Sequence, residues 1–443
     1  MNHHAPRLAA LPPRFGCLGD WLAWQESLHV REIELGLDRV RAVAERMGIG
    51  RPGYATVTVG GTNGKGSSVA MLDAILGAAG YRVGRYTSPH LVRYNERIRI
   101  GGDAVADDAI CASFDRIDQA RGDISLTYFE FGTLAALDIF FRSGIDVAIL
   151  EVGMGGRLDA VNIIDADVAL VATVDIDHVE WLGTDREAIG WEKAGIFRSA
   201  RPAVCSDPQP PQSLRRHAGQ IGSRLLLLGR EYGYEMAAAG WSWWSDRQRF
   251  DVLPRPRLIG DFQLQNAAGV LMALQELASR CPVTRGAIEQ GLRTVTLSGR
   301  FQVFSGPPVW ILDVAHNPQS AHVLAETLRA RPAAGRTLFM TGMLRDKDIG
   351  GVFRAMSGLA DEWHLVTLAG RRGATAAQLA DHLRQLPEEV PMTLHATVDA
   401  AFAMLGATAG SNDRILVFGS FLTVAGVAML LERDGARPVA ARA

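Results

Sequence analysis

A glycine-rich loop with one lysine follows an apolar strand pattern and precedes an apolar helix pattern; it reads TVTVGGTNGKGSSVAMLDAIL from Thr56. Its glycines permit positive φ angles and a close approach of the backbone to a ligand. The backbone N–H groups that open the following helix can bind phosphate oxygens, and Lys65 adds a positive charge. The strict pattern G-x-x-x-x-G-K-[ST] fails, because Val59 replaces the first glycine and Gly66 follows the lysine. The segment therefore predicts a nucleotide site with altered spacing.

Polar side chains stand where three further apolar segments end. Ser88 follows one of them, Glu151 ends IDVAILE, and His178 closes DVALVATVDIDH. In an open α/β sheet, ligands bind beyond the carboxyl ends of the strands. A hydroxyl, a carboxylate and an imidazole beside a triphosphate could hold Mg²⁺, although Mg²⁺ prefers oxygen ligands. Each residue alone is also an ordinary turn or capping residue, so only their shared position supports a metal site.

Other candidates lie farther along the chain. Lys193 in EKAGIF is ambiguous, because composition alone favours a solvated helix lysine or one paired with Glu192. Arg300 stands at an expected domain junction, and Asp313 and His316 belong to a turn that could face the first domain across a cleft. Together the candidates indicate an ATP-using enzyme. They leave open whether it phosphorylates an alcohol, activates a carboxylate or switches like a GTPase.

The composition is that of an ordinary globular enzyme, with 443 residues, 48% hydrophobic and 21% charged. The net charge of -2 predicts no strong attraction to nucleic acid or to an anionic membrane. The four cysteines are far apart in sequence, which disfavours a disulfide framework or a zinc cluster and fits a reducing cytoplasm. No apolar run approaches the roughly 18 residues that a membrane-spanning helix needs. We therefore expect a cytoplasmic protein, and nothing in the sequence demands a partner subunit.

The hydrophobic periodicity predicts an α/β fold. We expect helical structure over 21–47, a buried helix over 127–144, and doubly buried strands near 145–151 and 167–174. Strands that alternate with helices imply a parallel sheet. Residues 220–257 look like short antiparallel strands, in which the tryptophans at 241, 243 and 244 pack rather than bind. A helix over 261–278 is expected to follow.

A second strand, turn and helix series begins near residue 303 and is typical of a Rossmann-like domain. We place the boundary between 1–297 and 298–443. The expected fold is an N-terminal domain of P-loop type, with a mostly parallel sheet and a small antiparallel subdomain, followed by a C-terminal Rossmann-like α/β domain.

An ordered set of motifs resembles the folylpolyglutamate synthases of the Mur ligase superfamily, over roughly 18–430. The motifs are GTNGKGS, TSPHL, LTYFEFGT, LEVGMGGRLDA, DHVEWLG, EKAGIFR, GRFQ and DVAHNP. The resemblance explains the altered loop and implies an ATP-dependent ligase that joins L-glutamate to dihydropteroate or to reduced folates. The rival functions are a Mur-type amino-acid ligase of cell-wall precursors and a nucleotide switch. A monomer that binds ATP, its acid substrate and glutamate is expected, without nucleic acid or membrane.

The resemblance also implies roles for individual residues. The ATP-binding set is Thr62, Asn63, Gly64, Lys65, Gly66, Ser67, Asn266, Arg300 and Asp313. The Mg²⁺ ligands are Ser88, Glu151 and His178. The pterin-binding set is Thr127, Tyr128, Phe129, Glu130, Leu158, Asp159 and Ala160. The catalytic set is Lys65, Lys193 and His316, and Lys193 is expected to carry a carbamate. One departure is Leu422, where many relatives have histidine.

Overall fold

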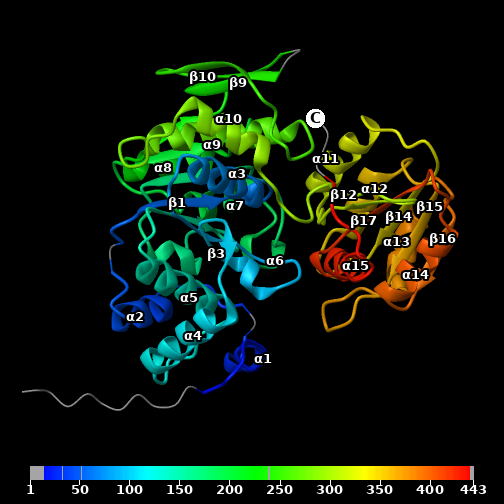
Figure 1. Ribbon diagram of the computed structural model, residues 1–443, viewed down its shortest axis with the longest axis horizontal. Helices are drawn as coiled ribbons and strands as arrows, with labels where there is room; N and C mark the ends of the chain where they lie inside the picture. Colours follow the sequence, from blue (N-terminus) through cyan, green and yellow to red (C-terminus); the bar gives the residue numbers. More distant parts are fainter. Residues whose placement is uncertain (1–13, 32, 51, 238–239, 440–443) are drawn as a thin grey trace, which may run out of the picture.

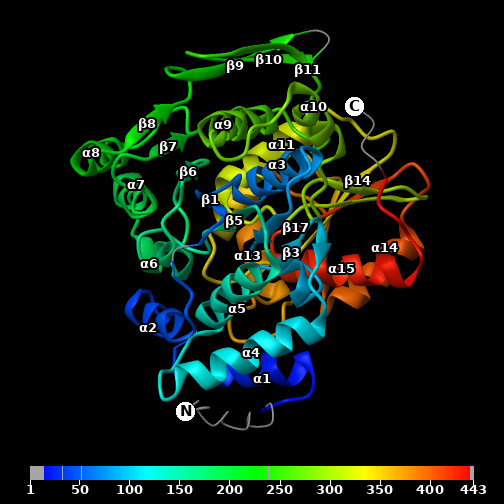
Figure 2. The same ribbon diagram turned by 60° about the vertical axis from the view of Figure 1, so that its left-hand side comes forward.

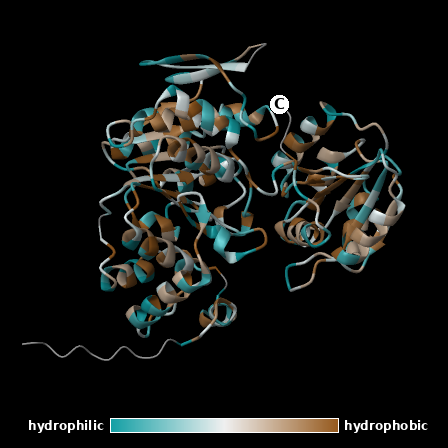
Figure 3. Ribbon diagram, in the orientation of Figure 1, coloured by the Kyte–Doolittle hydropathy of each residue, from teal (hydrophilic) through white to brown (hydrophobic). Residues whose placement is uncertain are grey.

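Two large sheets, one in each half of the chain, organise the protein (Figure 1). The computed structural model describes residues 14–31, 33–50, 52–237 and 240–439. In Figure 3 the helices carry both hydrophobic and hydrophilic residues, as expected for elements with one face against a sheet. No helix in these ranges is long and apolar enough to cross a membrane.

The first sheet has eight strands and is mostly parallel, as predicted. Its order is β4 (Asp103–Ala104), β3 (Ile98–Ile100), β2 (Val83–Tyr86), β5 (Val147–Glu151), β1 (Ala55–Gly60), β6 (Val168–Val171), β7 (Pro202–Cys205) and β8 (Arg224–Leu227). The β2–β3 and β3–β4 pairs are antiparallel, and the other neighbours pair in parallel. The central strands are buried on both faces, which explains their nearly continuous apolar runs.

Helices cover both faces of this sheet. One face packs on α3 (Lys65–Ala78), α9 (Phe262–Leu277) and α10 (Arg285–Thr294). The opposite apolar cluster contains α1 (Leu18–Leu28), α2 (Asp38–Arg46), η1 (Tyr94–Arg97), α4 (Asp107–Arg121), α5 (Tyr128–Ser143), η2 (Ala160–Ile163), α6 (Val179–Leu182), α7 (Arg186–Ala194) and α8 (Gln212–Ile221). The residues of β5 alternate between the two clusters, since Val147 and Ile149 join the first and Ala148 and Leu150 the second.

One expectation for the first half is refined and one was wrong. The periodic segment 21–47 has the expected helical structure, divided between two helices, α1 and α2. The chain leaves α1 at His29 in an extended conformation, and before α2 the Gly36 N–H donates to the Leu158 carbonyl oxygen. Strand β8 also extends the parallel sheet beside β7, where we expected an antiparallel strand. A short apolar run in the sequence does not reveal the strand with which it pairs.

The expected antiparallel subdomain is a three-stranded sheet above the helices α9 and α10 (Figure 2). It consists of β9 (Tyr232–Ala237), β10 (Gly240–Ser245) and β11 (Arg249–Leu253). Trp241 and Trp243 are fully buried, and the Trp243 indole donates to the Ala268 carbonyl oxygen of α9. Their packing role is therefore confirmed.

The second sheet has the order β12 (Gln302–Phe304), β13 (Val309–Leu312), β17 (Arg414–Phe418), β14 (Thr337–Thr341), β15 (Glu362–Val366) and β16 (Met392–His395). Only its edge strand β12 is antiparallel. One apolar cluster contains α11 (Pro318–Arg329), α12 (Ile349–Met356) and α13 (Ala376–Leu383), and the other contains α14 (Val398–Thr408) and α15 (Phe421–Arg433). This is the doubly wound arrangement that was predicted. The boundary at 297/298 stays a prediction.

Candidate active site

A cavity of about 670 Å³ lies between the phosphate loop and the second domain. Its volume suits a small-molecule ligand. Its lining includes, from the first domain, Thr62, Asn63, Gly64, Lys65, Gly66, Ser67, Ser88, Glu151, His178 and Asn266, and from the second domain, Arg300, Asp313, His316 and Leu422. The structure thus brings together the residues that we assigned to ATP and Mg²⁺. The expected pterin residues and Lys193 do not line this cavity.

The loop geometry suits phosphate binding. Gly64 caps α3 in the left-handed region at φ 84°, and a Cβ there would lie 2.5 Å from the Asn266 Oδ1. A side chain at Gly64 is therefore excluded both by backbone conformation and by space. A Cβ on Gly66, by contrast, would make only ordinary contacts. The Lys65 ammonium donates to the carbonyl oxygens of Gly61 and Thr62, at 2.9 and 3.1 Å, which holds it over the loop.

The three predicted metal ligands all line the cavity. The Ser88 N–H donates to the Glu151 carboxylate at 3.3 Å. Burial raises the pKa of Glu151, and the nearby Lys65 opposes that rise. Burial, with the charge of Lys347, lowers the pKa of His178 to about 4, so its imidazole is neutral at pH 7 and can ligate a cation. This donor set fits a divalent cation.

The fit depends on a hydroxyl as the third donor. Across the described ranges, no three side chains among His, Cys, Asp and Glu form a cluster that could hold a metal. Ser88 must therefore contribute, and the assignment of all three ligands stays a prediction.

The second domain presents an arginine and a carboxylate held at the turn after β13. The Asp313 carboxylate accepts the backbone N–H groups of Phe301 and Ala315, at 2.9 and 2.8 Å, so its position is fixed. The Arg300 guanidinium lies over the Phe421 ring, 5.7 Å from its centroid. Next to Phe421, the side chain of Leu422 is 55% exposed and lines the cavity. The one departure from the family pattern therefore lies at the wall of the site.

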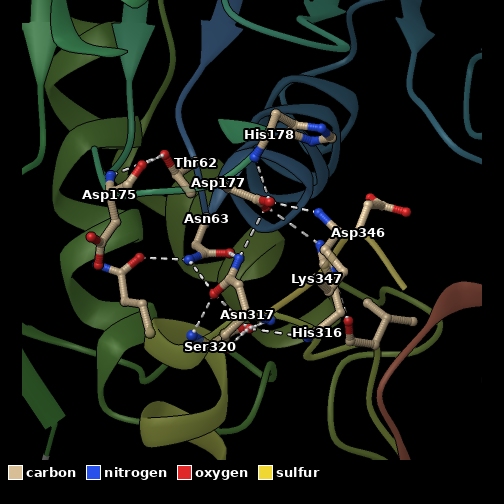
Figure 4. A network of polar contacts seen from close by, with 12 residues as sticks. Thr62, Asn63, Asp175, Asp177, His178, His316, Asn317, Ser320, Asp346 and Lys347 are labelled. Carbon is tan, nitrogen blue, oxygen red and sulfur yellow. Dashed lines mark hydrogen bonds and ion pairs between the residues drawn. The ribbon is translucent and has the colours of Figure 1, made fainter. Parts of the chain in front are cut away.

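A polar network joins the two domains across the cavity (Figure 4). The amides of Asn63 and Asn317 donate to each other at 3.2 Å. The Asp177 carboxylate accepts from the Lys347 ammonium at 2.6 Å and from the Asn317 amide at 3.2 Å. Burial raises the pKa of Asp177, but the neighbouring His316 and Lys347 outweigh burial and hold it well below its usual range. The carboxylate is therefore ionised, and it ties the phosphate-loop domain to the second domain.

Sequence reasoning missed Lys347. Its side chain is only 8% exposed, and it lies in the turn after β14, at the carboxyl end of a parallel strand. The rule that predicted Ser88 and Glu151 could have found it, because ligands gather at that edge of a sheet.

Lys347→Met is expected to reduce kcat/KM for ATP by about 10- to 100-fold, because it leaves Asp177 without its cation and displaces the second domain. Steady-state ADP release would measure the effect. Arg345→Met is the matched control, since it removes an exposed charge from the same turn. Equal kinetics for both variants would show that the ion pair does not position the domains.

The expected pterin segment begins α5 beside the cavity. Thr127 caps the helix, its own N–H donates to the Glu130 carboxylate at 2.8 Å, and Arg39 pairs with Glu130 at 3.0 Å. A Cβ on Gly153, a cavity residue, would lie 2.7 Å from the Phe129 ring. The ring therefore packs directly behind the cavity wall.

The second part of the expected pterin set lies close to this ring. The Asp159 carboxylate accepts the N–H groups of Met154 and Val161, at 2.9 and 3.1 Å. Burial raises the pKa of Asp159 to about 7 despite these donors. The flanking Leu158 holds the loop before α2, and Ala160 starts η2 and is buried. Phe129 and Asp159 both approach Gly153, so the two segments form one wall.

Lys193 is not the solvated lysine that composition alone suggests. It is 3% exposed on α7, and Glu192 pairs with Arg157 at 2.9 Å. Burial, reinforced by the charge of Lys65, lowers the pKa of Lys193 to about 7. Its amine is therefore substantially neutral at physiological pH.

Comparisons with known proteins show the family to which the chain belongs. Residues 59–274 match the Mur ligase middle domain, and residues 299–421 match the Mur ligase glutamate ligase domain. The dihydrofolate synthase/folylpolyglutamate synthase of Escherichia coli (strain K12) is 46% identical, covering 94% of this chain and 96% of that protein. The Haemophilus influenzae protein of the same name is 41% identical, covering 92% and 96%.

Solved structures extend the likeness to three dimensions. E. coli FolC in complex with DHPP and ADP superposes with a TM-score of 0.90 at 45% identity, covering 96% of this chain and 100% of that chain. A bifunctional folylpolyglutamate synthase/dihydrofolate synthase with Mn, AMPPNP and L-glutamate bound gives 0.87 at 45% identity, covering 95% and 99%. This chain therefore belongs to the dihydrofolate synthase/folylpolyglutamate synthase family of Mur ligases.

Proposed function

We propose that the protein is an ATP-dependent ligase that joins L-glutamate to dihydropteroate and to reduced folates. The products are dihydrofolate and folylpolyglutamates, with ADP and phosphate. The observation that carries the proposal is the cavity in which Lys65 and Glu151 of one domain face Arg300 and Asp313 of the other. Close relatives that are named for this activity, and solved with ADP, AMPPNP and L-glutamate, support it.

In the first step a substrate carboxylate attacks the γ-phosphate of ATP, which gives an acyl phosphate and ADP. The helix N-terminus and Lys65 stabilise the charge on the transferred group. A divalent cation held by Ser88, Glu151 and His178 would supply further charge neutralisation. Arg300 reaches the nucleotide from the second domain, so domain closure completes the site.

In the second step the glutamate amine attacks the acyl carbonyl, and phosphate leaves from the tetrahedral intermediate. His316 is held for this step, with Nδ1 2.7 Å from the Val314 carbonyl oxygen and Nε2 3.6 Å from Asp177. We assign to His316 the orientation of the amine or of the acyl phosphate. Closure of the two domains, which the contacts of Asp177 join, would exclude water that could otherwise hydrolyse the intermediate.

We further propose that Lys193 carries a carbamate. Carbamate formation needs a neutral amine, which adds to CO₂ and releases a proton. The lowered pKa of Lys193 supplies that neutral amine. The positive charge of Lys65, which disfavours an ammonium at Lys193, favours the anionic carbamate at the same place.

A coupled assay of ADP release tests the proposed function. Release should require L-glutamate together with dihydropteroate or tetrahydrofolate. Release that instead requires a UDP-linked cell-wall precursor would indicate a Mur-type ligase of those precursors. Tight nucleotide binding without any glutamate-dependent release would indicate a nucleotide switch.

Phe129→Ala should raise the KM for dihydropteroate by about 10-fold, because the ring would pack on the flat heterocycle. The KM for ATP should change less than about 2-fold. Phe141→Ala is the matched control, since Phe141 lies on the same helix with 54% of its surface exposed. A parallel rise in both KM values for Phe129→Ala would contradict the pterin assignment.

A further inference from the structure

Arg97 is a buried cation that contacts a histidine and two tyrosine rings. It is 8% exposed at the end of η1. Its Nε donates to the His90 Nδ1 at 2.8 Å, and its guanidinium lies 5.3 and 5.4 Å from the ring centroids of Tyr94 and Tyr128. Among the residues that the structure describes, no carboxylate of another side chain forms an ion pair with it.

These contacts do not neutralise the charge of Arg97. Because the Arg97 Nε–H donates to the His90 Nδ1, that ring nitrogen carries no proton, and the imidazole serves as a neutral acceptor. The nearby carboxylate of Glu96 is occupied, because it accepts the backbone N–H groups of Leu91, Val92 and Arg93. A buried charge is costly unless an anion pairs with it, so the surroundings of Arg97 fit an anionic ligand.

The location of Arg97 indicates which part of a bound ligand the guanidinium would contact. The Thr87 N–H donates to the Arg97 carbonyl oxygen at 2.9 Å, which places Arg97 beside the end of β2. Ser88, the next residue, lines the cavity. On the other side Tyr128 begins α5, the expected pterin segment. The guanidinium thus lies between the expected pterin site and the site of phosphoryl transfer.

The two acid substrates differ in the charge they carry at that position. Dihydropteroate has one carboxylate, and that group must react. A reduced folate has two on its terminal glutamate: the γ-carboxylate reacts, and the α-carboxylate lies between it and the aminobenzoyl ring. We propose that Arg97 binds this α-carboxylate and so determines the use of folates as acid substrates. The inference rests on the proposed function and adds a specificity residue to it.

The reacting carboxylate is a poorer partner for Arg97. That group must meet the γ-phosphate near Lys65 and Glu151, and Arg97 is not part of the cavity lining. A firm ion pair would also lower its nucleophilicity. The planar guanidinium, held by His90 and by two aromatic faces, suits a static carboxylate that it can bind with two hydrogen bonds.

The test compares both acid substrates in the glutamate-dependent ADP assay. Arg97→Met should raise the KM for tetrahydrofolate by about 10- to 100-fold. The KM for dihydropteroate should change less than about 3-fold. Arg93→Met is the matched control, because it removes an exposed arginine from the same segment, and it should change neither value. Arg97→Gln, a milder change that keeps a donor, should show the same selectivity.

A chemically modified substrate provides a second test of the role of Arg97. One substrate for this test is tetrahydrofolate whose α-carboxylate has been converted to an amide. Its KM with the unchanged enzyme should be raised as much as the KM of tetrahydrofolate is raised by Arg97→Met. The variant should lose nothing further with the amide, because both changes remove the same ion pair.

Equal loss with both acid substrates, unchanged kinetics, or additive loss with the amide would each overturn the role of Arg97. Failure of the proposed function has a different signature, which is no activity of the unchanged enzyme with either acid. Direct binding of tetrahydrofolate to the unchanged enzyme and to Arg97→Met would then still decide the role of Arg97.

Discussion

Lys65→Ala is expected to lower the kcat of glutamate-dependent ADP release by about 10²- to 10³-fold. The ammonium is the one loop group whose charge can follow the transferred phosphoryl group, whereas the backbone amides of α3 remain in the variant. Those amides should keep much of the affinity for ATP. Steady-state kinetics and direct nucleotide binding, measured on one preparation, separate the two effects.

Gly66→Ala is the matched control within the loop. Its added Cβ would meet only ordinary contacts, 3.6 Å from Leu297 and 3.8 Å from Glu151, so turnover should persist. Gly64→Ala should behave differently, because its Cβ would lie 2.5 Å from Asn266. A near-normal kcat for Lys65→Ala would contradict the assignment of this loop to phosphoryl transfer.

The sequence predicted what depends on local pattern. Ser88, Glu151 and His178 became candidates because each stands at the end of an apolar run, and parallel strands bring their carboxyl ends to one edge. All three line the cavity, and their role as metal ligands stays a prediction. The fold class followed from the same alternation, and it is confirmed, as is the membership in the family. Local pattern could not show that β8 joins the parallel sheet. An apolar run of four residues can pair with a parallel or with an antiparallel neighbour.

Contacts between the domains were beyond the sequence. The sequence assigned no role to Asp177 or to Lys347. Their ion pair joins residues 170 positions apart and depends on how two separately folded sheets face each other. The environment of Arg97 was hidden for the same reason, because the sequence around Arg97 does not show which side chains will pack against it.

The lysines of the chain lie at or near the candidate active site. The chain has only three lysines, Lys65, Lys193 and Lys347, and arginine supplies every other cationic side chain of that kind. Lys65 and Lys347 line the cavity, and Lys193 is buried near enough for Lys65 to lower its pKa. Arginine stays charged and binds in a planar fork, whereas lysine offers a compact charge and an amine that can lose its proton. The three lysines thus lie where a lysine side chain would contact phosphate, a buried carboxylate or CO₂.

Lys193→Ala is expected to lower kcat by about 100-fold, because an anion that supports the metal ligands would be lost. Added bicarbonate should not restore activity, since alanine has no amine. Glu192→Gln is the control on the same helix, because it removes only the half-buried ion pair with Arg157. Nuclear magnetic resonance of the unchanged enzyme in carbon-13-labelled bicarbonate should show one carbamate signal, which the Lys193→Ala variant lacks.

The pH dependence gives an independent check on the carbamate. The unmodified amine loses its proton as the pH rises through about 7, because burial has lowered the pKa of Lys193 from 10.5. Only the neutral amine adds CO₂, and the addition releases a proton, so carbamate occupancy at fixed dissolved CO₂ should rise with pH through that range until the lysine is fully modified. A solvent-exposed lysine would still be almost fully protonated there. Full activity with an unmodified Lys193 would contradict the carbamate and return this lysine to a packing role.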